Sequence, residues 1–371
     1  MSGMGRPITL YQPKRLEIGA GAAAALGDWA SGVERPLVIA SGPTEQYVER
    51  LKLGGYVTVL ADVPPEPDLP ALERILTAAR EAKPDLVVGL GGGSVLDIAK
   101  LVAAVWDGTQ TLLNIAGPNK VAGRRTPLAQ VPTTAGTGSE AGIRALVTDP
   151  DTKSKIAVES PHLLADIAIL DPELTYSVPP AVTAATGIDA MAHCVEAFTN
   201  VRAHDLIDGY ARMGFTLVGR YLRRAVENGT DTEARAGMML ASYYGGLCLG
   251  PVNTAAGHAL AYPLGTRLSL PHGLANAIIF PHVLAWNEPV RPEKTAEVAR
   301  ALGLHGDNDL LSAAHGFCEE LGVEMRLSAH GADRAAFPDW ARDAHAIRRL
   351  MDNNPRDMSS DDVARIYDAA Y

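Results

Sequence analysis

An acid and a histidine stand out in the stretch "TAATGIDAMAHCVEAFTN", residues 183–200. Nearly every residue from Thr183 to Cys194 is small or apolar, as in a helix that is packed on all sides, yet Asp189 and His193 lie within that run. Because they are four residues apart, a helix projects both from one face, where they can bind the same metal ion. The alternative is a buried Asp–His pair that only satisfies its own hydrogen bonds.

Two further histidines have surroundings like those of His193. His258 and His272, within "NTAAGHALAYPLGTRLSLPHGLANAIIFPH", are each flanked by glycine and small apolar residues, which clear space around an imidazole. One carboxylate and three imidazoles suit a first-row divalent ion with one or more positions left open to a substrate. We interpret His282, ten residues after His272, as a structural or supporting residue.

A glycine-rich turn follows a run of buried-strand type in "PDLVVGLGGGSVLDIAK", residues 84–100. The pattern predicts a strand, a tight turn at Gly92 and Gly93, and a helix with Ser94 as its N-cap and Asp97 three residues later. Glycines let a backbone approach a ligand closely, and the free N–H groups at the start of a helix favour a phosphate. The turn therefore predicts the pyrophosphate site of a dinucleotide. The alternative is a turn that merely closes a βα unit.

A second polar loop, "VPTTAGTGSEAG" at residues 131–142, follows another predicted strand. It places four hydroxyl side chains among glycines, namely Thr133, Thr134, Thr137 and Ser139. Such hydroxyl groups can hydrogen-bond a cofactor with little steric bulk. We expect both loops at the carboxyl edge of one parallel sheet, where folds of this kind bind their ligands.

These candidate residues require two kinds of scaffold. From residue 35 to about 150, short β-branched runs alternate with longer helix-like segments, which predicts an α/β architecture with a parallel sheet. After the proline-rich stretch "DPELTYSVPPAV", long apolar-periodic segments indicate a mostly helical region. We place the boundary near residue 176, with a dinucleotide-binding α/β domain at 1–176 and a helical metal-binding and catalytic domain at 177–371.

The composition of the chain excludes some classes of binding partner. Its 371 residues include 43 acidic and 33 basic side chains, a formal net charge of -10, without the basic block that binds nucleic acid or an anionic membrane. The sequence has no apolar signal core and no run of about 18 apolar residues, so we expect no membrane segment. Three cysteines cannot form a disulfide framework, and we expect a cytoplasmic protein that acts on small molecules.

With both loops and the four candidate ligands identified, the chain resembles the iron-containing (group III) alcohol dehydrogenase family over essentially its whole length. The matching blocks are "LEIGAGAAAALG", "GGGSVLDIAK", "PTTAGTGSE", "DPELTYSVPP", "GIDAMAHCVEAF", "PHGLANAIIFPHV" and "NNPRDMSSDDVARIYDAAY". The resemblance implies a dehydroquinate synthase-like architecture: an N-terminal dinucleotide-binding α/β domain, an all-helical C-terminal domain, and a cleft between them for nicotinamide and metal. It also implies a homodimer.

The resemblance further implies roles for individual residues. The metal ligands would be Asp189, His193, His258 and His272. The cofactor, NAD or NADP, would be contacted by Gly92, Gly93, Ser94, Asp97, Thr133, Thr134, Thr137, Ser139 and Lys155. Iron is the metal that the resemblance favours, with zinc as the alternative, since aspartate and histidine accept several divalent ions.

Two positions depart from the family's pattern. Tyr262, a further catalytic candidate, stands four residues after His258, where many members carry another histidine. A phenol is a poorer proton relay at neutral pH than an imidazole. Gly42 stands where an acidic residue would often bind the adenosine 2′-hydroxyl, and without that carboxylate a 2′-phosphate meets less repulsion. We therefore expect NADPH to be accepted at least as well as NADH.

The predicted function is reversible hydride transfer between NAD(P) and a small alcohol or aldehyde whose oxygen binds the metal. Alternatives within the fold are a metal-independent maleylacetate reductase type, a small hydroxy-acid or semialdehyde reductase, a glycerol dehydrogenase-like enzyme and a dehydroquinate synthase. The four ligand positions argue against the first, and the last would need basic residues that 183–200 lacks. The non-enzymatic alternative is a nucleotide-binding regulator that has lost its chemistry.

Arg267 is the residue that we connect with substrate choice. It lies between His258 and His272, so its guanidinium could pair with a carboxylate carried a few bonds from the reacting carbonyl. The alternative is an arginine that faces solvent, as most do, in which case plain short alcohols and aldehydes stay the expected substrates.

Overall fold

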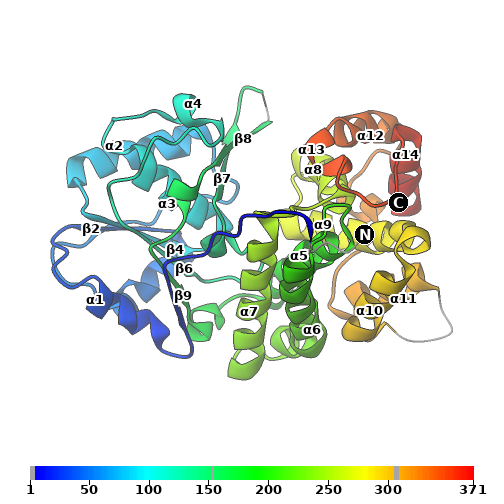
Figure 1. The fold of residues 1–371 in the computed structure, drawn as a ribbon, viewed down its shortest axis with the longest axis horizontal. Coiled ribbons are helices and arrows are strands. Elements are labelled where there is room, and N and C mark those ends of the chain that lie inside the picture. The colour runs from blue at the N-terminus through cyan, green and yellow to red at the C-terminus, as the bar shows by residue number, and fades with distance from the viewer. Residues whose placement is uncertain (1–4, 153, 305–308) are drawn as a thin grey trace. The chain divides into compact units, whose positions relative to one another are not determined.

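The structure is a computed structural model and describes residues 5–152, 154–304 and 309–371 (Figure 1). The chain packs as two compact units: Leu10–Val178 forms one, and Pro179–Tyr371 with Met1–Thr9 forms the other. The sequence analysis placed the two domains at 1–176 and 177–371, and those functional ranges remain a prediction. None of the described helices is long and apolar enough to cross a membrane.

The first unit is built on a six-stranded parallel sheet, as the alternating sequence pattern predicted. The strands, in spatial order, are β1 (Arg15–Ile18), β9 (Ile167–Leu170), β6 (Leu128–Pro132), β4 (Leu86–Gly91), β2 (Pro36–Ala40) and β3 (Thr58–Leu60). Every residue of β2, β4, β6 and β9 is buried. Continuous burial of this kind is expected for strands of a parallel sheet that helices cover on both faces.

Successive residues of the central strands enter two different cores. Val87 packs in the core that contains α2 (Leu69–Ala82) and α3 (Gly93–Val105), whereas Val88 packs in the core that contains α1 (Ala25–Trp29). Figure 1 shows the same arrangement, with α2 and α3 on one face of the sheet and α1 on the other. Both faces are therefore occupied, and the loops that follow the strands supply the polar groups at the carboxyl edge.

A smaller three-stranded sheet belongs to the same unit, and the sequence analysis did not predict it. Its order is β5 (Gly117–Pro118), β8 (Ser154–Glu159) and β7 (Arg144–Asp149), with β7 and β8 antiparallel. In β8 only Val158 is fully buried, so this strand lacks the continuous apolar run that identified the main sheet. The short helix α4 (Leu112–Ile115) precedes β5 along the chain.

The second unit contains helices and no strands among its described residues, in agreement with the predicted helical region. Its α-helices are α5 (Pro180–Thr199), α6 (Asp205–Glu227), α7 (Thr232–Leu249), α8 (Ala256–Leu268), α9 (His272–Asn287), α10 (Pro292–Leu302), α11 (Leu310–Glu320), α12 (Phe337–His345), α13 (Arg348–Met351) and α14 (Ser360–Ala369). Most of α5 is buried, because it packs against α6, α7 and α9. Its small and apolar residues allow this enclosure.

Close packing of α6 against α10 yields a test of the helical unit. A Cβ atom added at Gly219 would lie 1.9 Å from the carbonyl oxygen of Ala301 in α10, so we expect Gly219→Ala to force the helices apart and destabilise the unit by about 1–3 kcal/mol. Gly209 in the same helix has no neighbouring heavy atom within 4 Å of such a Cβ. Gly209→Ala should instead stabilise by about 0.5–1 kcal/mol through helix propensity. Urea unfolding of both variants measures the difference, and equal effects would contradict the packing.

Candidate metal and cofactor sites

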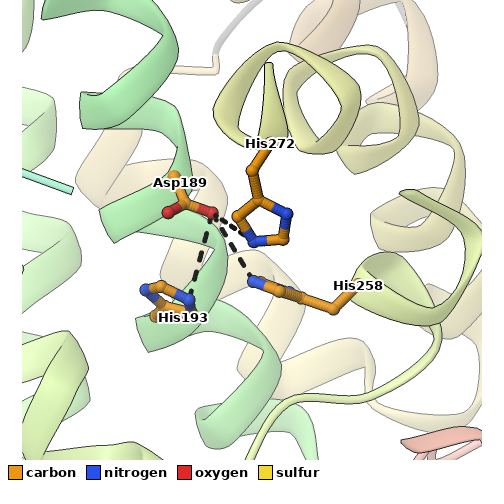
Figure 2. Close-up of side chains that lie close together, drawn as sticks. All are labelled: Asp189, His193, His258 and His272. Carbon is orange, nitrogen blue, oxygen red and sulfur yellow. Dashed lines mark ion pairs between the residues drawn. The ribbon is translucent and has the colours of Figure 1, made fainter. Parts of the chain in front are cut away.

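Three helices of the second unit bring together the four residues expected to bind a metal. Asp189 and His193 come from α5, His258 from the first turn of α8, and His272 from the start of α9 (Figure 2). Their ligand atoms all lie within 4.8 Å of one another. The first three side chains are buried, while that of His272 is 31% exposed, so the cluster is accessible from the side of His272.

The spacing fits a bound cation better than a set of hydrogen bonds. The Nε2 atoms of His258, His272 and His193 lie 3.5, 3.6 and 3.9 Å from Asp189 Oδ1. Four ligands held at about 2.1 Å by a tetrahedral ion would lie about 3.4 Å from one another. In addition, His258 Nε2 is buried without a hydrogen-bond partner among the described residues. A buried nitrogen left in this state destabilises the fold until a ligand binds it.

The ionisation of the cluster favours cation binding. Burial by itself raises the pKa of Asp189, but the neighbouring imidazoles lower the pKa below its ordinary value, so the carboxylate stays ionised. Burial lowers the pKa of His193 to about 4, which leaves that imidazole neutral and able to donate its lone pair. Burial also acts to lower the pKa of His258, but the carboxylates of Glu196 and Asp189 raise it to about 10. A proton therefore neutralises part of this buried negative charge until a metal ion replaces it.

Two polar residues that the sequence analysis missed hold the cluster in place. Glu196 Oε1 lies 2.6 Å from His258 Nδ1, and Asn276 Nδ2 donates to Asp189 Oδ1 at 2.8 Å. Both residues are buried. The carboxylate of Glu196 keeps the proton of His258 on Nδ1, so that Nε2 faces the other ligands. A signal was present in the sequence: Asp189, His193 and Glu196 follow helical i, i+4, i+7 spacing, and Asn276 lies four residues after His272.

Glycines beside the histidines allow the three helices to approach closely. A Cβ atom at Gly257 would lie 2.6 Å from Glu196 Oε1, and one at Gly273 would lie 2.5 Å from the carbonyl oxygen of Ala185 in α5. The small neighbours noted in the sequence thus make room for contacts between helices as well as for the imidazoles.

Tyr262 and Arg267, both in α8, have different surroundings. The Tyr262 ring stacks on His272, with ring centroids 6.0 Å apart, so the phenol lies at the accessible side of the cluster. Arg267 pairs with Asp343 at 2.7 Å, and both side chains are about half exposed. Its guanidinium already has a carboxylate partner, which disfavours the anion-binding role that we considered for it. His282 is buried and is not one of the four clustered residues.

In the first unit, three loops meet at one edge of the main sheet. β4 is hydrogen-bonded to both β2 and β6, and the loops that follow these strands contain Gly42, Gly92 and Thr133. The two outer loops also bond to the end of β4, since Thr133 N donates to the Gly91 carbonyl at 3.0 Å and Thr44 Oγ1 donates to the Leu90 carbonyl at 2.9 Å. The two polar loops predicted to share the carboxyl edge therefore do so.

The glycine turn has a packing role that the sequence did not reveal. A Cβ atom at Gly93 would lie 2.6 Å from Thr137 Cγ2, and one at Gly92 would lie 3.1 Å from Thr134 Oγ1. The glycines therefore leave space for the loop of residues 131–142, which we call the threonine loop, as well as for any ligand. One prediction was wrong: the N-cap of α3 is Gly92 and not Ser94, because the helix begins almost immediately after β4 ends. The Ser94 hydroxyl instead accepts a hydrogen bond from the Glu66 backbone at 3.2 Å.

Asp97 and Ser139, both predicted to contact a cofactor, are engaged within the protein. Ser139 Oγ donates to Asp97 Oδ1 at 2.6 Å, and the other carboxylate oxygen accepts from the Leu146 backbone at 3.0 Å. The buried ammonium of Lys100 donates to Ser139 Oγ and to its carbonyl. These bonds fix the shape of the threonine loop. Lys155 forms an ion pair with Glu66 and donates to Thr148 Oγ1 at 2.8 Å.

Most of the chain matches one protein family. Residues 13–172 match the family described as iron-containing alcohol dehydrogenase, and residues 183–371 match the C-terminal part of the Fe-containing alcohol dehydrogenase family. Long-chain-alcohol dehydrogenase 1 of Geobacillus thermodenitrificans is 39% identical over 350 residues, which cover 91% of this chain and 88% of that protein.

Two solved structures are also similar. That of a 1,3-propanediol oxidoreductase has a TM-score of 0.91 and 30% identity, and it covers 99% of this chain and 100% of its own. The sulfoacetaldehyde reductase of Bifidobacterium kashiwanohense, solved in complex with NAD+, has a TM-score of 0.89 and 27% identity, with 99% of each chain covered.

Glu140, in the 3-10 turn Ser139–Ala141, makes the stability of the threonine loop depend on pH. Burial raises its pKa from 4.5 to about 7, although the Lys100 ammonium acts in the opposite direction. The protonated carboxyl therefore contributes stability that is complete below pH 4.5 and is lost as the pH rises to about 7. We expect the unfolding free energy of the wild type to fall by about 2 kcal/mol relative to Glu140→Gln between pH 5 and 7.5.

Urea unfolding at several pH values measures this difference. Glu45→Gln, at an exposed glutamate of the same unit, is the matched control and should show the pH dependence of the wild type. Parallel curves for the wild type and Glu140→Gln would contradict the assignment.

Proposed function

Because the chain belongs to the iron-containing alcohol dehydrogenase family, we propose that it catalyses reversible hydride transfer between a nicotinamide cofactor and a small alcohol or aldehyde at a divalent metal site. The observation that carries the proposal is the convergence of Asp189 and three histidines within 4.8 Å, with a buried His258 Nε2 that has no hydrogen-bond partner among the described residues. This arrangement argues against the metal-independent maleylacetate reductase type. It also argues against a nucleotide-binding regulator without catalytic activity, because such a protein would not need four metal ligands.

Asp189, His193, His258 and His272 would hold the ion, and the donor set suits iron, with zinc as the alternative. A divalent ion bound there supplies Lewis acidity toward the substrate oxygen, while hydride transfer is the chemistry of the nicotinamide. The protein's own part is positional. Glu196 sets the tautomer of His258, and the ionised Asp189 supplies negative charge to the site.

Tyr262 would act at the accessible side of the cluster, beside His272. Its hydroxyl can hydrogen-bond an alcohol or pass a proton, in the position where many family members have a histidine. In the first unit, the turn at Gly92 and Gly93 with the start of α3 would bind the cofactor pyrophosphate. Thr134, Thr137 and Lys155 would bind the rest of the cofactor. The hydrogen bonds of Asp97 and Ser139 support an indirect role for them, as braces of that loop.

The metal role has a direct test in two variants. We expect Asp189→Ala to abolish stoichiometric metal binding and nearly all activity, because it removes the only anionic ligand among the four. Glu196→Gln should keep the fold and lower metal affinity by about 10- to 100-fold, because the orienting partner of His258 loses its charge. Bound metal is measured by elemental analysis and competition with a chelator, and Asp343→Ala is the control at an exposed carboxylate. Undiminished turnover by fully demetallated wild type would rule out the proposed mechanism.

Cofactor preference depends on Gly42, which opens the 3-10 helix Gly42–Leu51 after β2 and is exposed. We expect NADPH to be used at least as well as NADH, because no carboxylate at this position repels a 2′-phosphate or binds a 2′-hydroxyl. Gly42→Asp should shift the preference toward NADH. The measurement is kcat/KM with NADPH and with NADH, for the wild type and for Gly42→Asp. A strong NADH preference in the wild type that Gly42→Asp leaves unchanged would show that this position is not decisive.

We also propose that the protein acts as a homodimer in the cytoplasm, without nucleic acid or membrane partners. The dimer rests on the family resemblance alone. The location is supported by three buried cysteines that are free thiols, Cys194, Cys248 and Cys318, as is usual for proteins of a reducing compartment. Sedimentation of the purified protein tests the dimer.

A further inference from the structure

The accessible side of the metal cluster leads to a cationic side chain that the proposed reaction does not use. Tyr262 stacks on His272, and the guanidinium carbon of Arg349 lies 5.7 Å from the centre of the Tyr262 ring. Arg349 Nη2 also donates a hydrogen bond to the Tyr262 hydroxyl at 3.3 Å. His272 is the most exposed of the four clustered residues. Outward from the cluster, the contacts therefore run from His272 to the Tyr262 ring and then to the Arg349 guanidinium.

Within the described part of the chain, Arg349 has no acidic partner, whereas Arg267 and Arg348 each have one. Arg267 pairs with Asp343 at 2.7 Å, and Arg348 pairs with Asp352. Among the residues that the structure describes, no carboxylate forms an ion pair with Arg349, whose guanidinium contacts an aromatic ring and a phenol. An exposed guanidinium that an aromatic ring orients, and that lacks a counter-charge, is available to an anionic group of a ligand.

We propose that Arg349 binds the anionic end of the substrate and makes the enzyme selective for short ω-hydroxy and ω-oxo carboxylates over uncharged alcohols and aldehydes. The inference rests on the proposed function, because it takes the reacting oxygen to lie at the Asp189 cluster. A guanidinium binds a carboxylate through two parallel N–H···O bonds, a geometry that a lysine does not offer. The Tyr262 ring centre lies 6.0 Å from that of His272 and 5.7 Å from the Arg349 guanidinium carbon, so Arg349 lies close enough to the cluster for a short substrate to contact both.

The test compares succinic semialdehyde with butanal, which has the same number of carbons but no charge. We expect the wild type to prefer the anionic aldehyde in kcat/KM, and Arg349→Ala to reduce that preference by roughly tenfold or more, mainly through KM. Arg267→Ala is the matched control, because it removes the same charge from a side chain that already pairs with Asp343. Its preference should equal that of the wild type. Higher ionic strength should weaken the preference of the wild type and have little effect in Arg349→Ala.

Other outcomes have distinct meanings. An equal loss of efficiency toward both aldehydes in Arg349→Ala would show that the arginine only supports Tyr262, and it would overturn the proposal. A preference that Arg349→Ala leaves unchanged would overturn it too. If the metal-loaded wild type reduced neither aldehyde, the proposed function would be wrong. Calorimetry with 4-hydroxybutyrate would then test separately whether Arg349 binds the carboxylate. A tenfold weaker affinity in Arg349→Ala than in the wild type would support the anion site, and an equal affinity would contradict it.

Discussion

The site depends on one constraint, an ionised carboxylate enclosed by helices. Asp189 is 2% exposed, and a carboxylate removed from water destabilises a fold by several kcal/mol unless positive charge compensates for it. The imidazoles around it provide that compensation only in part, since burial keeps His193 neutral at physiological pH. This requirement explains the arrangement of the helices: α5 consists largely of small residues, and α8 and α9 each begin beside it. Gly257 and Gly273 permit the close contacts.

Much of the candidate site was predictable because its main signal is local. Helical spacing placed Asp189 and His193 on one face, and small neighbours marked His258 and His272. The contact between Glu196 and His258 joins residues 62 positions apart, and no periodicity within one helix encodes it. Arg267 and Asp343 are 76 positions apart, so their ion pair could not be predicted from sequence spacing either. Sequence spacing thus identified which side chains share a helix face, but not which of them are already paired with another helix.

The fold was predictable to the extent that burial leaves a continuous pattern. The central strands of the main sheet are buried on both faces, and their β-branched runs identified them. The small sheet was missed because β8 buries a single residue completely, and the N-cap of α3 was misplaced because the turn after Gly91 is shorter than we expected. An observed role and a proposed role of the glycine turn also share one sequence pattern. The side chain of Thr137 requires the absence of a Cβ at Gly93, and the same absence would admit a phosphate, so the sequence alone could not distinguish the two roles.

All four clustered ligands belong to one compact unit, and the three loops at the sheet edge belong to the other. The two sets of residues therefore come from separate stretches of the chain, each packed within its own unit. The connection at Val178 and Pro179 is therefore a natural crossover point for recombination between homologous genes. An exchange there would join the four clustered side chains of one parent to the sheet-edge loops of the other.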